Sequence, residues 1–275
     1  MEKRKRRERR QKEREQLGDA APPPPPQRTL DNTREPDDTF VQPDDEELKN
    51  DTAVDEFAEF FLNKGMPKIL ITTSPHRNKR GKETMSFVED LLKMFPNMTF
   101  RERRNYALKE IVDYCKAENY TDIMVVNEDA KQPNSLLLCH LPDGPTALFK
   151  LTSVILSQNI HNHAAPSDHY PEIILNRFST RLGHSIGRMF AALVPAQPEF
   201  VGRRVMTFHN QRDFVFFRQH RYVFDSPEKA RLQEIGPRFT LKLKYLQHGT
   251  FDSKFGEYEW LPKKELVTSR RRFFL

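Results

Sequence analysis

The sequence has few cysteines and no long apolar run. Its two cysteines, Cys115 and Cys139, lie too far apart for a paired-cysteine metal site and are too few for a disulfide framework. No apolar stretch approaches the roughly 18 residues that a membrane-spanning helix needs. The first residues, MEKRKRRERRQKER, are charged, unlike the apolar core of a signal peptide. We therefore expect a soluble, intracellular protein in a reducing compartment, with no membrane partner.

The signatures of common enzymes are also missing. The sequence contains no GxGxxG, GxSxG or HExxH motif. The loop HRNKRGKET has a Gly-Lys pair, but the earlier glycine of a phosphate-binding loop is absent and Glu83 replaces its Ser or Thr. Three histidines, His161, His163 and His169, lack a defined ligand spacing, which favours a polar loop over a metal site. We expect no catalytic residues, no cofactor, no metal and no small-molecule substrate.

Charge is distributed unevenly along the chain. The formal net charge of +6 is the balance of +5 in residues 1–30, −10 in 31–59, +3 in 60–164 and +8 in 165–275. The mean hydropathy of −0.75 is low for a chain that is folded throughout. We expect residues 1–59 to be a disordered charged tail, whose weakly amphipathic end, residues 54–62, could form a short helix that docks elsewhere. The basic C-terminal half is expected to meet a polyanion, with nucleic acid the first candidate.

Strands and helices alternate in the first half of the folded region. The run at 66–74 predicts a buried strand, because its apolar residues favour β structure and Pro67 and Pro75 bound it. Apolar residues recur at helical spacing from Lys82 to Pro96 and again over 108–115. Residues 123–126 predict another strand, and residues 135–141 and 146–154 predict a β-hairpin. This alternation indicates an α/β fold.

The second half looks like a distant copy of the first. Residues 172–178 predict a strand, residues 180–194 a helix, and residues 214–224 and 238–246 two further strands. In the helix, Arg181 and Arg188 lie opposite the apolar stripe, so we expect a cationic outer face. In the last strand, Arg238, Lys242 and Lys244 alternate with apolar residues, which predicts one wet basic face.

Basic residues form clusters in both halves. A single cluster is usually solvated surface, but recurrence among aromatic residues favours RNA, which is bound through phosphates and stacked bases. A further cluster, Arg101, Arg103 and Arg104, follows a turn. The RNA-binding candidates are Arg77, Lys79, Arg80, Lys82, Arg181, Arg188, Arg203, Arg204, Arg218, Arg221, Arg238, Lys242 and Lys244.

Long stretches of the second half resemble a known family. GRMFAALVPAQPEFVGRRVMTFHNQRDFVFFRQHRYVF, GPRFTLKLKYLQHGTFDSKFGEYEW and the terminal SRRRFFL are similar to the Brix superfamily of ribosome-biogenesis proteins. The resemblance extends more loosely back to PKILITTS. It implies a Brix domain over residues 60–275, of α/β (α+β) class. Its two similar halves, 65–160 and 165–275, would each resemble an anticodon-binding-like fold and follow a disordered tail over 1–59.

The resemblance also implies a function. Members of the superfamily act without catalysis in maturation of the large (60S) ribosomal subunit. They bind precursor ribosomal RNA within pre-60S particles, among ribosomal proteins and assembly factors, and typically pair with a dedicated assembly-factor protein. We therefore expect localisation to the nucleus and nucleolus. The superfamily's sigma-70-like motif matches residues 235–251, which ranks Arg238, Lys242 and Lys244 first among the RNA contacts.

Two other classes of function remain open. The basic loop from Arg77 to Lys82 is compatible with an RNA-processing nuclease or a nucleotide hydrolase. The basic N-terminal run is compatible with a DNA-binding transcription factor. Metal-dependent turnover by the pure protein would favour the first alternative. Tighter binding of duplex DNA than of structured RNA at matched salt would favour the second.

Overall fold

The computed structural model describes residue 9 and residues 27–29, 31–35, 38–41, 45–63, 65–75, 80–251, 256–262 and 271–275. Two of the candidate residues, Arg77 and Lys79, lie outside these described residues. Residues 1–34 and 35–275 form separate units. The described part of the first unit includes a short 3₁₀ turn, η2 (Asp31–Thr33). The second unit is the one that carries the features below.

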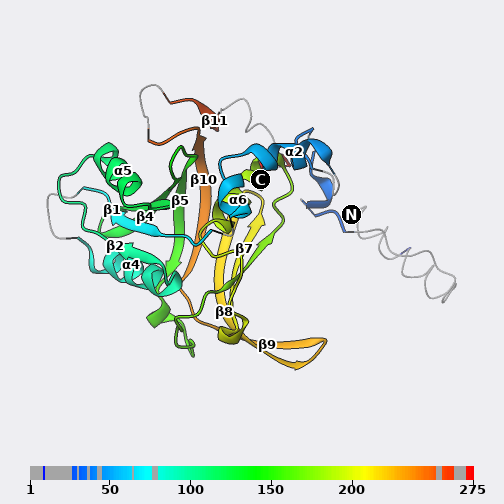
Figure 1. Cartoon of the computed structure of the whole chain (residues 1–275). Helices are drawn as coiled ribbons and strands as arrows, with labels where there is room; N and C mark the ends of the chain where they lie inside the picture. Colours follow the sequence, from blue (N-terminus) through cyan, green and yellow to red (C-terminus); the bar gives the residue numbers. More distant parts are fainter. Residues whose placement is uncertain are drawn as a thin grey trace. The chain divides into compact units, whose positions relative to one another are not determined.

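A continuous mixed sheet organises the second unit (Figure 1). In its first half, β1 (Ile69–Thr73) lies between β2 (Met98–Phe100) and β3 (Asp122–Asp129) and runs parallel to both. The sheet continues with two antiparallel strands, β4 (Gln132–His140) and β5 (Thr146–Ile155). This half therefore has three parallel strands followed by an antiparallel meander, as the alternation of strands and helices predicts.

The second half repeats the same plan. Here β6 (Glu172–Asn176) is parallel to β7 (Arg204–Gln211), and β8 (Phe214–Ser226) and β10 (Arg238–Gln247) follow as antiparallel strands. The two halves meet where β10 pairs antiparallel with β5, so the sheet order is β2-β1-β3-β4-β5-β10-β8-β7-β6. At this junction Leu241 lies opposite Leu151. The predicted α/β class is confirmed.

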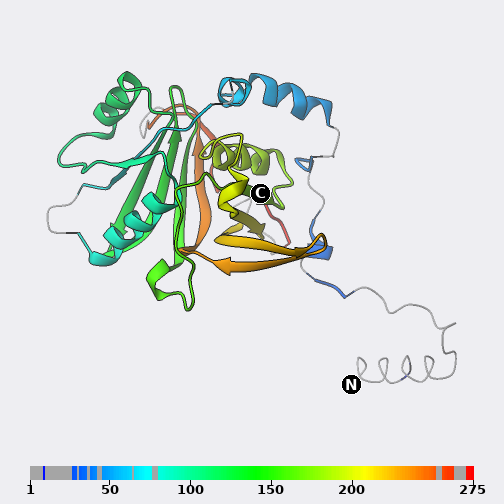
Figure 2. The same ribbon diagram turned by 60° about the horizontal axis from the view of Figure 1, so that its bottom comes forward.

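The helices in the described ranges cover one face of the sheet in both halves and the other face in the first half only. The inner face packs against α4 (Lys82–Met94) and α6 (Arg181–Ala191), whose apolar residues share one core with the strands (Figures 1 and 2). On the opposite face, α5 (Leu108–Ala117) packs over β1, β3 and β4 in a separate, smaller core. The apolar periodicities that predict these helices reflect this burial.

Aromatic rings link the inner helices through the sheet. Phe190 of α6 stacks on Phe208 of β7, with ring centroids 4.3 Å apart. Phe217 of β8 stacks on Phe239 of β10 at 4.4 Å, and Phe87 of α4 meets Phe239 edge-on at 5.6 Å. Offset stacking and edge-to-face contacts are the favoured arrangements of aromatic pairs. Most of the aromatic content of these segments therefore belongs to the core.

Two short helices precede the sheet. They are α2 (Glu46–Val54), capped by the Asp45 carboxylate, and α3 (Ala58–Leu62). Between them Phe57 is buried, with its ring centroid 4.5 Å from that of His140. The sequence predicts a charged tail over residues 1–59 whose end, residues 54–62, could form a short docking helix. The structure has such a helix in α3 and, in addition, the helix α2 within the tail. Phe57 and Phe60 are buried in the inner core, whereas α2 buries no residue and is held by polar contacts of Arg181 and Arg188 with Glu47 and Thr52.

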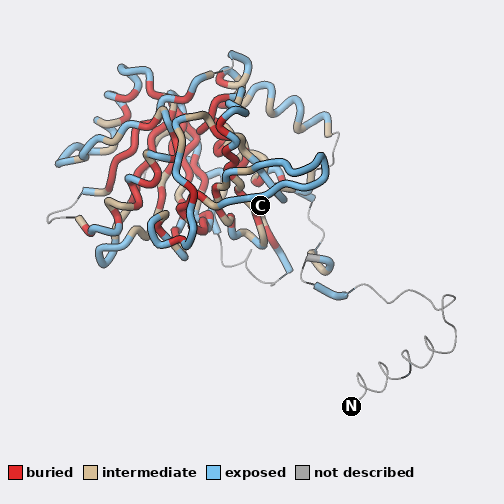
Figure 3. The backbone as a smooth tube through the Cα atoms, turned by 90° about the horizontal axis from the view of Figure 1, so that it is seen from below, coloured by how far each residue is buried: buried red, intermediate tan, exposed pale blue. Residues whose placement is uncertain are grey.

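The far end of β8 leaves the sheet as a hairpin arm. Its residues from His220 onward pair with β9 (Lys229–Glu234), and the two strands of the arm are largely exposed (Figure 3). At the opposite end of the sheet β11 (Tyr258–Trp260) pairs with the end of β10. The 3₁₀ turns η3 (Ser157–Asn159) and η4 (Phe200–Gly202) connect elements. No helix in the described ranges is long and apolar enough to cross a membrane.

Candidate nucleic-acid interface

The outer face of the second half of the sheet, together with β5, carries alternating polar, basic and aromatic side chains. We call this surface the open face, because none of the described helices packs on it. Register places on it Lys150 and Thr152 of β5, Thr240 and Lys242 of β10, Phe214, Phe216, Arg218 and His220 of β8, and Thr207 and His209 of β7. The partner positions, such as Phe217 and Leu241, point into the core. The two-residue period of the strands thus separates a basic face from an apolar one.

Two lysines face each other at the centre of the open face. Lys242 lies directly opposite Lys150 in the β10–β5 pair, and both side chains are exposed. Directly opposed residues have Cβ atoms about 5 Å apart, and side chains of like charge at opposed positions destabilise a sheet pair. Neither lysine forms an ion pair with a carboxylate in the described part of the chain. The pair is therefore a site where an anion would relieve a built-in repulsion.

Aromatic rings lie beside these lysines. The Lys242 Nζ atom is 4.8 Å from the ring centroid of Phe214, which is partly exposed. Phe216 is half-buried and lies opposite His209 across the β7–β8 pair. Exposed rings on a sheet, next to cations, are a common platform for unpaired RNA bases, which stack on the rings while phosphates meet the cations.

A charged cluster forms the boundary between the open face and the hairpin arm. Arg238 donates two hydrogen bonds to the carboxylate of Glu234, at 2.7 and 2.6 Å, and Arg218 Nε lies 3.9 Å from the same group. The hydrogen bonds from Arg238 lower the pKa of Glu234. Burial lowers the pKa of nearby His220, which favours its neutral form. Glu234 thus offsets much of the positive charge of Arg238, one of the three residues that the sequence ranks first.

The basic strand 238–246 departs from strict alternation near its end. Its register against β5 shifts between Leu243 and Tyr245, so the buried positions are Leu243 and Leu246. Lys244 falls in this irregularity and is exposed, next to the half-buried Tyr245. A bulge of this kind re-aims side chains. Lys242 and Lys244 are both accessible, but they do not form the regular row that the sequence predicts.

Other candidates lie away from the open face. Arg203 is exposed in the turn that precedes β7 rather than within the strand, and Arg221 is exposed where β8 leaves the sheet. Arg80 and Lys82 lie at the start of α4, on the first half of the molecule. These four residues extend the basic character of the surface without joining the cluster around Lys242.

Arg204 is a structural residue and not a surface cation. Its side chain is 1% exposed and donates to the carbonyls of Ser167 and His169 and to those of Lys93 and Met94 at the end of α4. The amide of Gln219, with its oxygen toward the guanidinium, accepts two more bonds. Burial lowers the pKa of Arg204 to about 10, so it stays charged at neutral pH. Sequence analysis treats it as an RNA contact, but burial removes it from any RNA-facing surface.

The cationic face of α6 is occupied by the acidic segment of the same chain. Arg181 pairs with Glu47 of α2. Arg188 pairs with Asp55 and also donates to the carbonyl of Thr52 at 3.2 Å. As predicted, Arg181 and Arg188 lie on the outer face of this helix. However, carboxylates of the acidic segment neutralise both arginines. They are therefore poor candidates for RNA contacts.

Lys150 is the residue that sequence analysis missed. The signal was present in the segment TALFKLTSV, where Lys150 occupies an outward position between the core-facing Phe149 and Leu151. A single lysine in a strand carries little information by itself. Its importance depends on the non-local pairing of β5 with β10.

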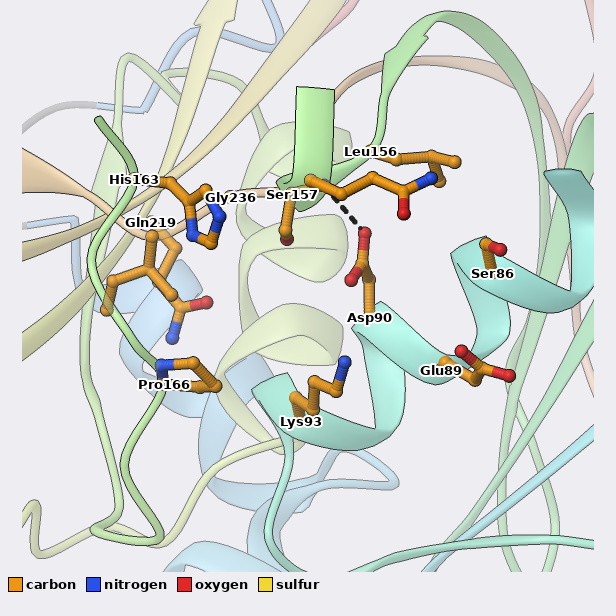
Figure 4. Close-up of a pocket in the computed structure, with 12 residues that line it drawn as sticks. Ser86, Glu89, Asp90, Lys93, Leu156, Ser157, His163, Pro166, Gln219 and Gly236 are labelled. Atoms are coloured by element: carbon orange, nitrogen blue, oxygen red, sulfur yellow. Dashed lines mark hydrogen bonds between the residues drawn. The ribbon is translucent and has the colours of Figure 1, made fainter. Parts of the chain in front are cut away.

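A small cavity of about 140 Å³ at the junction of the halves places a serine, a histidine and an aspartate together (Figure 4). Asp90 accepts a hydrogen bond from the backbone N–H of Ser157 at 2.8 Å, and the His163 ring contacts the Ala164 carbonyl at 3.3 Å. A nucleophilic triad requires the histidine to hydrogen-bond both the serine and the aspartate. In the described residues, His163 forms neither bond. The described residues also contain no group of three or more His, Cys, Asp or Glu arranged to hold a metal ion.

Comparison with known proteins defines the family. A family model described as Brix domain matches residues 78–245. The chain belongs to the Brix-domain family. It is 56% identical over 261 residues to ribosome production factor 1 of Xenopus laevis, covering 94% of this chain and 75% of that protein. It is 43% identical over 251 residues to ribosome production factor 1 of Saccharomyces cerevisiae, covering 90% of this chain and 81% of the relative.

Solved structures with a similar arrangement include a probable ribosomal biogenesis protein from Aeropyrum pernix K1. It has a TM-score of 0.47 and 17% sequence identity, covering 64% of this chain and 96% of that one.

Proposed function

We propose that this protein is a ribosome-biogenesis factor that binds precursor ribosomal RNA through its open face and supports assembly of the large (60S) subunit without catalysing a reaction. Membership of the Brix-domain family and identity to proteins named ribosome production factor 1 support a role in ribosome production. The open face supplies a physical basis for RNA binding.

The observation that carries the proposal is the opposed pair of Lys150 and Lys242 beside Phe214. Two like charges held directly opposite each other destabilise a sheet unless something else offsets the repulsion. A phosphate would neutralise both, and a base beside it would stack on the ring. Arg218 and Lys244 extend the same basic surface, and Glu234 limits it on the side of the hairpin arm.

RNA binding is tested by titrating structured ribosomal RNA segments and duplex DNA of equal length into the full-length protein over a range of salt. The double variant Lys150→Gln/Lys242→Gln should bind RNA more weakly by tenfold or more and lower the salt slope by about 1–2. Lys109→Gln, an exposed lysine on α5, is the matched control. Unchanged RNA affinity in the double variant would reject the open face as the RNA site, and a preference for DNA would favour a transcription factor.

The assignment to the large subunit is tested in cells. We expect the protein to be nuclear, concentrated in the nucleolus, and to sediment with pre-60S particles that contain ribosomal proteins and other assembly factors. The Lys150→Gln/Lys242→Gln variant should shift toward the free fraction. A protein that stays in the cytosol and never sediments with ribosomal precursors would contradict this part of the proposal.

A dedicated assembly-factor protein is the second partner we propose, and the hairpin arm is the surface that favours it. Phe224 and Leu232 are 66% and 61% exposed on neighbouring strands of the arm. Exposed apolar residues on a projecting hairpin are typical of a surface that a partner covers. The variant Phe224→Ser/Leu232→Ser should lose a stoichiometric protein partner on purification from cells but keep its RNA affinity. Retention of that partner would place the interface elsewhere.

A further inference from the structure

The first half of the molecule contains a larger cavity, of about 690 Å³, far from the open face in the sheet order. It is lined by β1, by the end of β2, by the loop that follows β2 and by α5. Small-molecule sites in proteins typically have volumes of about 300–1,000 Å³, so this cavity has room for a nucleotide. The cavity at the junction of the halves, at about 140 Å³, does not.

The topology of the sheet places this cavity where ligands are expected. β1 and β2 are adjacent and parallel, but β1 leads to α4 on the inner face whereas β2 leads to α5 on the outer face. Where neighbouring parallel strands lead to opposite faces, a crevice opens beyond their carboxyl ends, and open α/β sheets bind ligands there. The lining residues Thr72 and Phe100 come from these strand ends.

Three arginines supply positive charge to the cavity. Arg101, Arg103 and Arg104 follow β2 directly and all line it. Arg103 Nε donates to the carbonyl of Tyr106 at 3.1 Å, which holds the loop closed on itself. In the described residues none of the three pairs with a carboxylate. Burial lowers the pKa of Arg103, a sign that its charge is partly desolvated without an anion beside it.

Aromatic rings and a buried hydroxyl complete the lining. Tyr106 and Tyr114 are 58% and 46% exposed and both contribute to the wall. The Oγ1 atom of Thr72 is buried and has no hydrogen-bond partner in the described residues, although Thr72 itself lines the cavity and is 1% exposed. A buried hydroxyl without a partner costs free energy, and this one lies directly behind the cavity wall.

The acidic residues of the lining have different roles. Glu110 accepts a hydrogen bond from the backbone N–H of Ala107 at 2.7 Å and so caps the start of α5. Glu102 is exposed and offers an acceptor for a ribose hydroxyl. Arginines for a phosphate, tyrosines for a base and a carboxylate for a sugar together match the three parts of a nucleotide.

We propose that this cavity binds one nucleotide, with its phosphate on the arginines of the loop 101–104 and its base against Tyr106 and Tyr114. The same chemistry is presented by an unpaired nucleotide of an RNA strand and by a free nucleoside monophosphate. The proposal rests on the proposed RNA-binding function only if the nucleotide belongs to an RNA strand.

Two probes distinguish the sources, each applied to the full-length protein. The first is a single-stranded RNA oligonucleotide containing 4-thiouridine, crosslinked by light and mapped by mass spectrometry. The second is adenosine or uridine monophosphate, followed by ligand-detected nuclear magnetic resonance. Variants are Arg103→Gln and Tyr106→Ala, with Lys109→Gln as a matched control because Lys109 is exposed on α5 and does not line the cavity. Thermal unfolding checks that each variant is folded.

If RNA is the source, crosslinks should map to Tyr106 or Tyr114, fall by about tenfold in both variants and persist in the control. If free nucleotides are the source, the monophosphates should bind and lose affinity in the same variants while RNA crosslinks miss the cavity. Binding of neither probe, or binding that both variants leave unchanged, overturns the proposal. If crosslinks to the cavity persist at full yield in the Lys150→Gln/Lys242→Gln variant, the result would contradict RNA binding by the open face. It would not contradict nucleotide binding in this cavity.

Discussion

Arg188 of α6 binds the carboxylate of Asp55 through two of its nitrogens, with Nη2 2.7 Å from Oδ1 and Nε on Oδ2. Residues that lie 133 positions apart in sequence are thereby joined, and the acidic segment is fixed across the helix. The guanidinium also lies 4.7 Å from the ring centroid of Phe61. The contact anchors the end of a strongly acidic stretch to the folded unit.

The Arg188–Asp55 pair should contribute measurably to stability. Both side chains are only partly exposed, at 24% and 21%, so Asp55→Asn should lower the free energy of unfolding by about 1–3 kcal/mol. Glu47→Gln is the control, since it breaks the exposed pair with Arg181 and should cost less than about 1 kcal/mol. Urea denaturation of both variants gives the comparison. Equal, small losses would mean that the Asp55 contact adds nothing.

Replacing Arg204 should destabilise the fold without altering the RNA-facing surface. Arg204→Met leaves four backbone carbonyls without this donor, including those of Lys93 and Met94 at the end of α4. We expect a loss of about 2–5 kcal/mol in the free energy of unfolding. RNA affinity measured well below the unfolding midpoint should be that of the parent protein. A marked loss of RNA affinity in the folded variant would restore Arg204 as a contact.

Glu234 should restrain RNA binding. Glu234→Gln removes the carboxylate beside Arg238 and Arg218, so RNA affinity should rise several-fold at low salt and the salt slope should increase by about 1. Glu228→Gln, an exposed carboxylate on the hairpin arm, is the control. A fall in affinity on removing Glu234 would show that it orients the arginines and that their orientation matters more than their charge.

The same carboxylate should make stability depend on acid. Hydrogen bonds from Arg238 lower the pKa of Glu234 below its ordinary value of 4.5. Its stabilising contribution is therefore fully present above that value and is lost as the pH falls through the lowered pKa. In acid titrations the parent protein should lose this contribution to the free energy of unfolding, whereas the variant Glu234→Gln should show no such loss. Parallel acid profiles of the two proteins would contradict the assignment.

The two thiols should be unreactive in the folded protein. Cys115 and Cys139 are buried against β1, β3 and α5, and burial raises the pKa of each thiol to about 12. At about pH 8 almost no thiolate is present, so an aromatic disulfide reagent should react slowly with the native protein and rapidly in denaturant. Release of one equivalent from the native protein would show that one thiol opens to solvent.

Local periodicity was sufficient to predict much of the fold. The helix predicted from Lys82 to Pro96 is α4, which ends at Met94, and the predicted hairpin is β4 and β5. Each of these elements buries one face against a neighbouring layer. Its apolar residues therefore recur at the helical or strand period within its own sequence. The resemblance to the Brix superfamily, carried mainly by the second half, was confirmed by comparison.

The partners of the charged side chains were not predictable. Arg188 and Arg204 look alike in the sequence, but one pairs with an acidic segment and the other holds the end of a helix 110 positions away. Lys150 and Lys242 become a pair only because β5 and β10 meet. Whether a charge is free, neutralised or buried depends on contacts between distant segments, which no local pattern records.

The pairing of β5 with β10 also fixes the geometry of anything the protein holds. Because the two halves share one hydrogen-bonded sheet, a chain cut between them would leave each half with a long unpaired edge strand prone to aggregation. In the intact molecule Lys242 and Tyr106 belong to the same compact unit, residues 35–275. An RNA strand that contacted both residues would have to span the distance between them, so the fold of this unit would constrain the shape of the RNA.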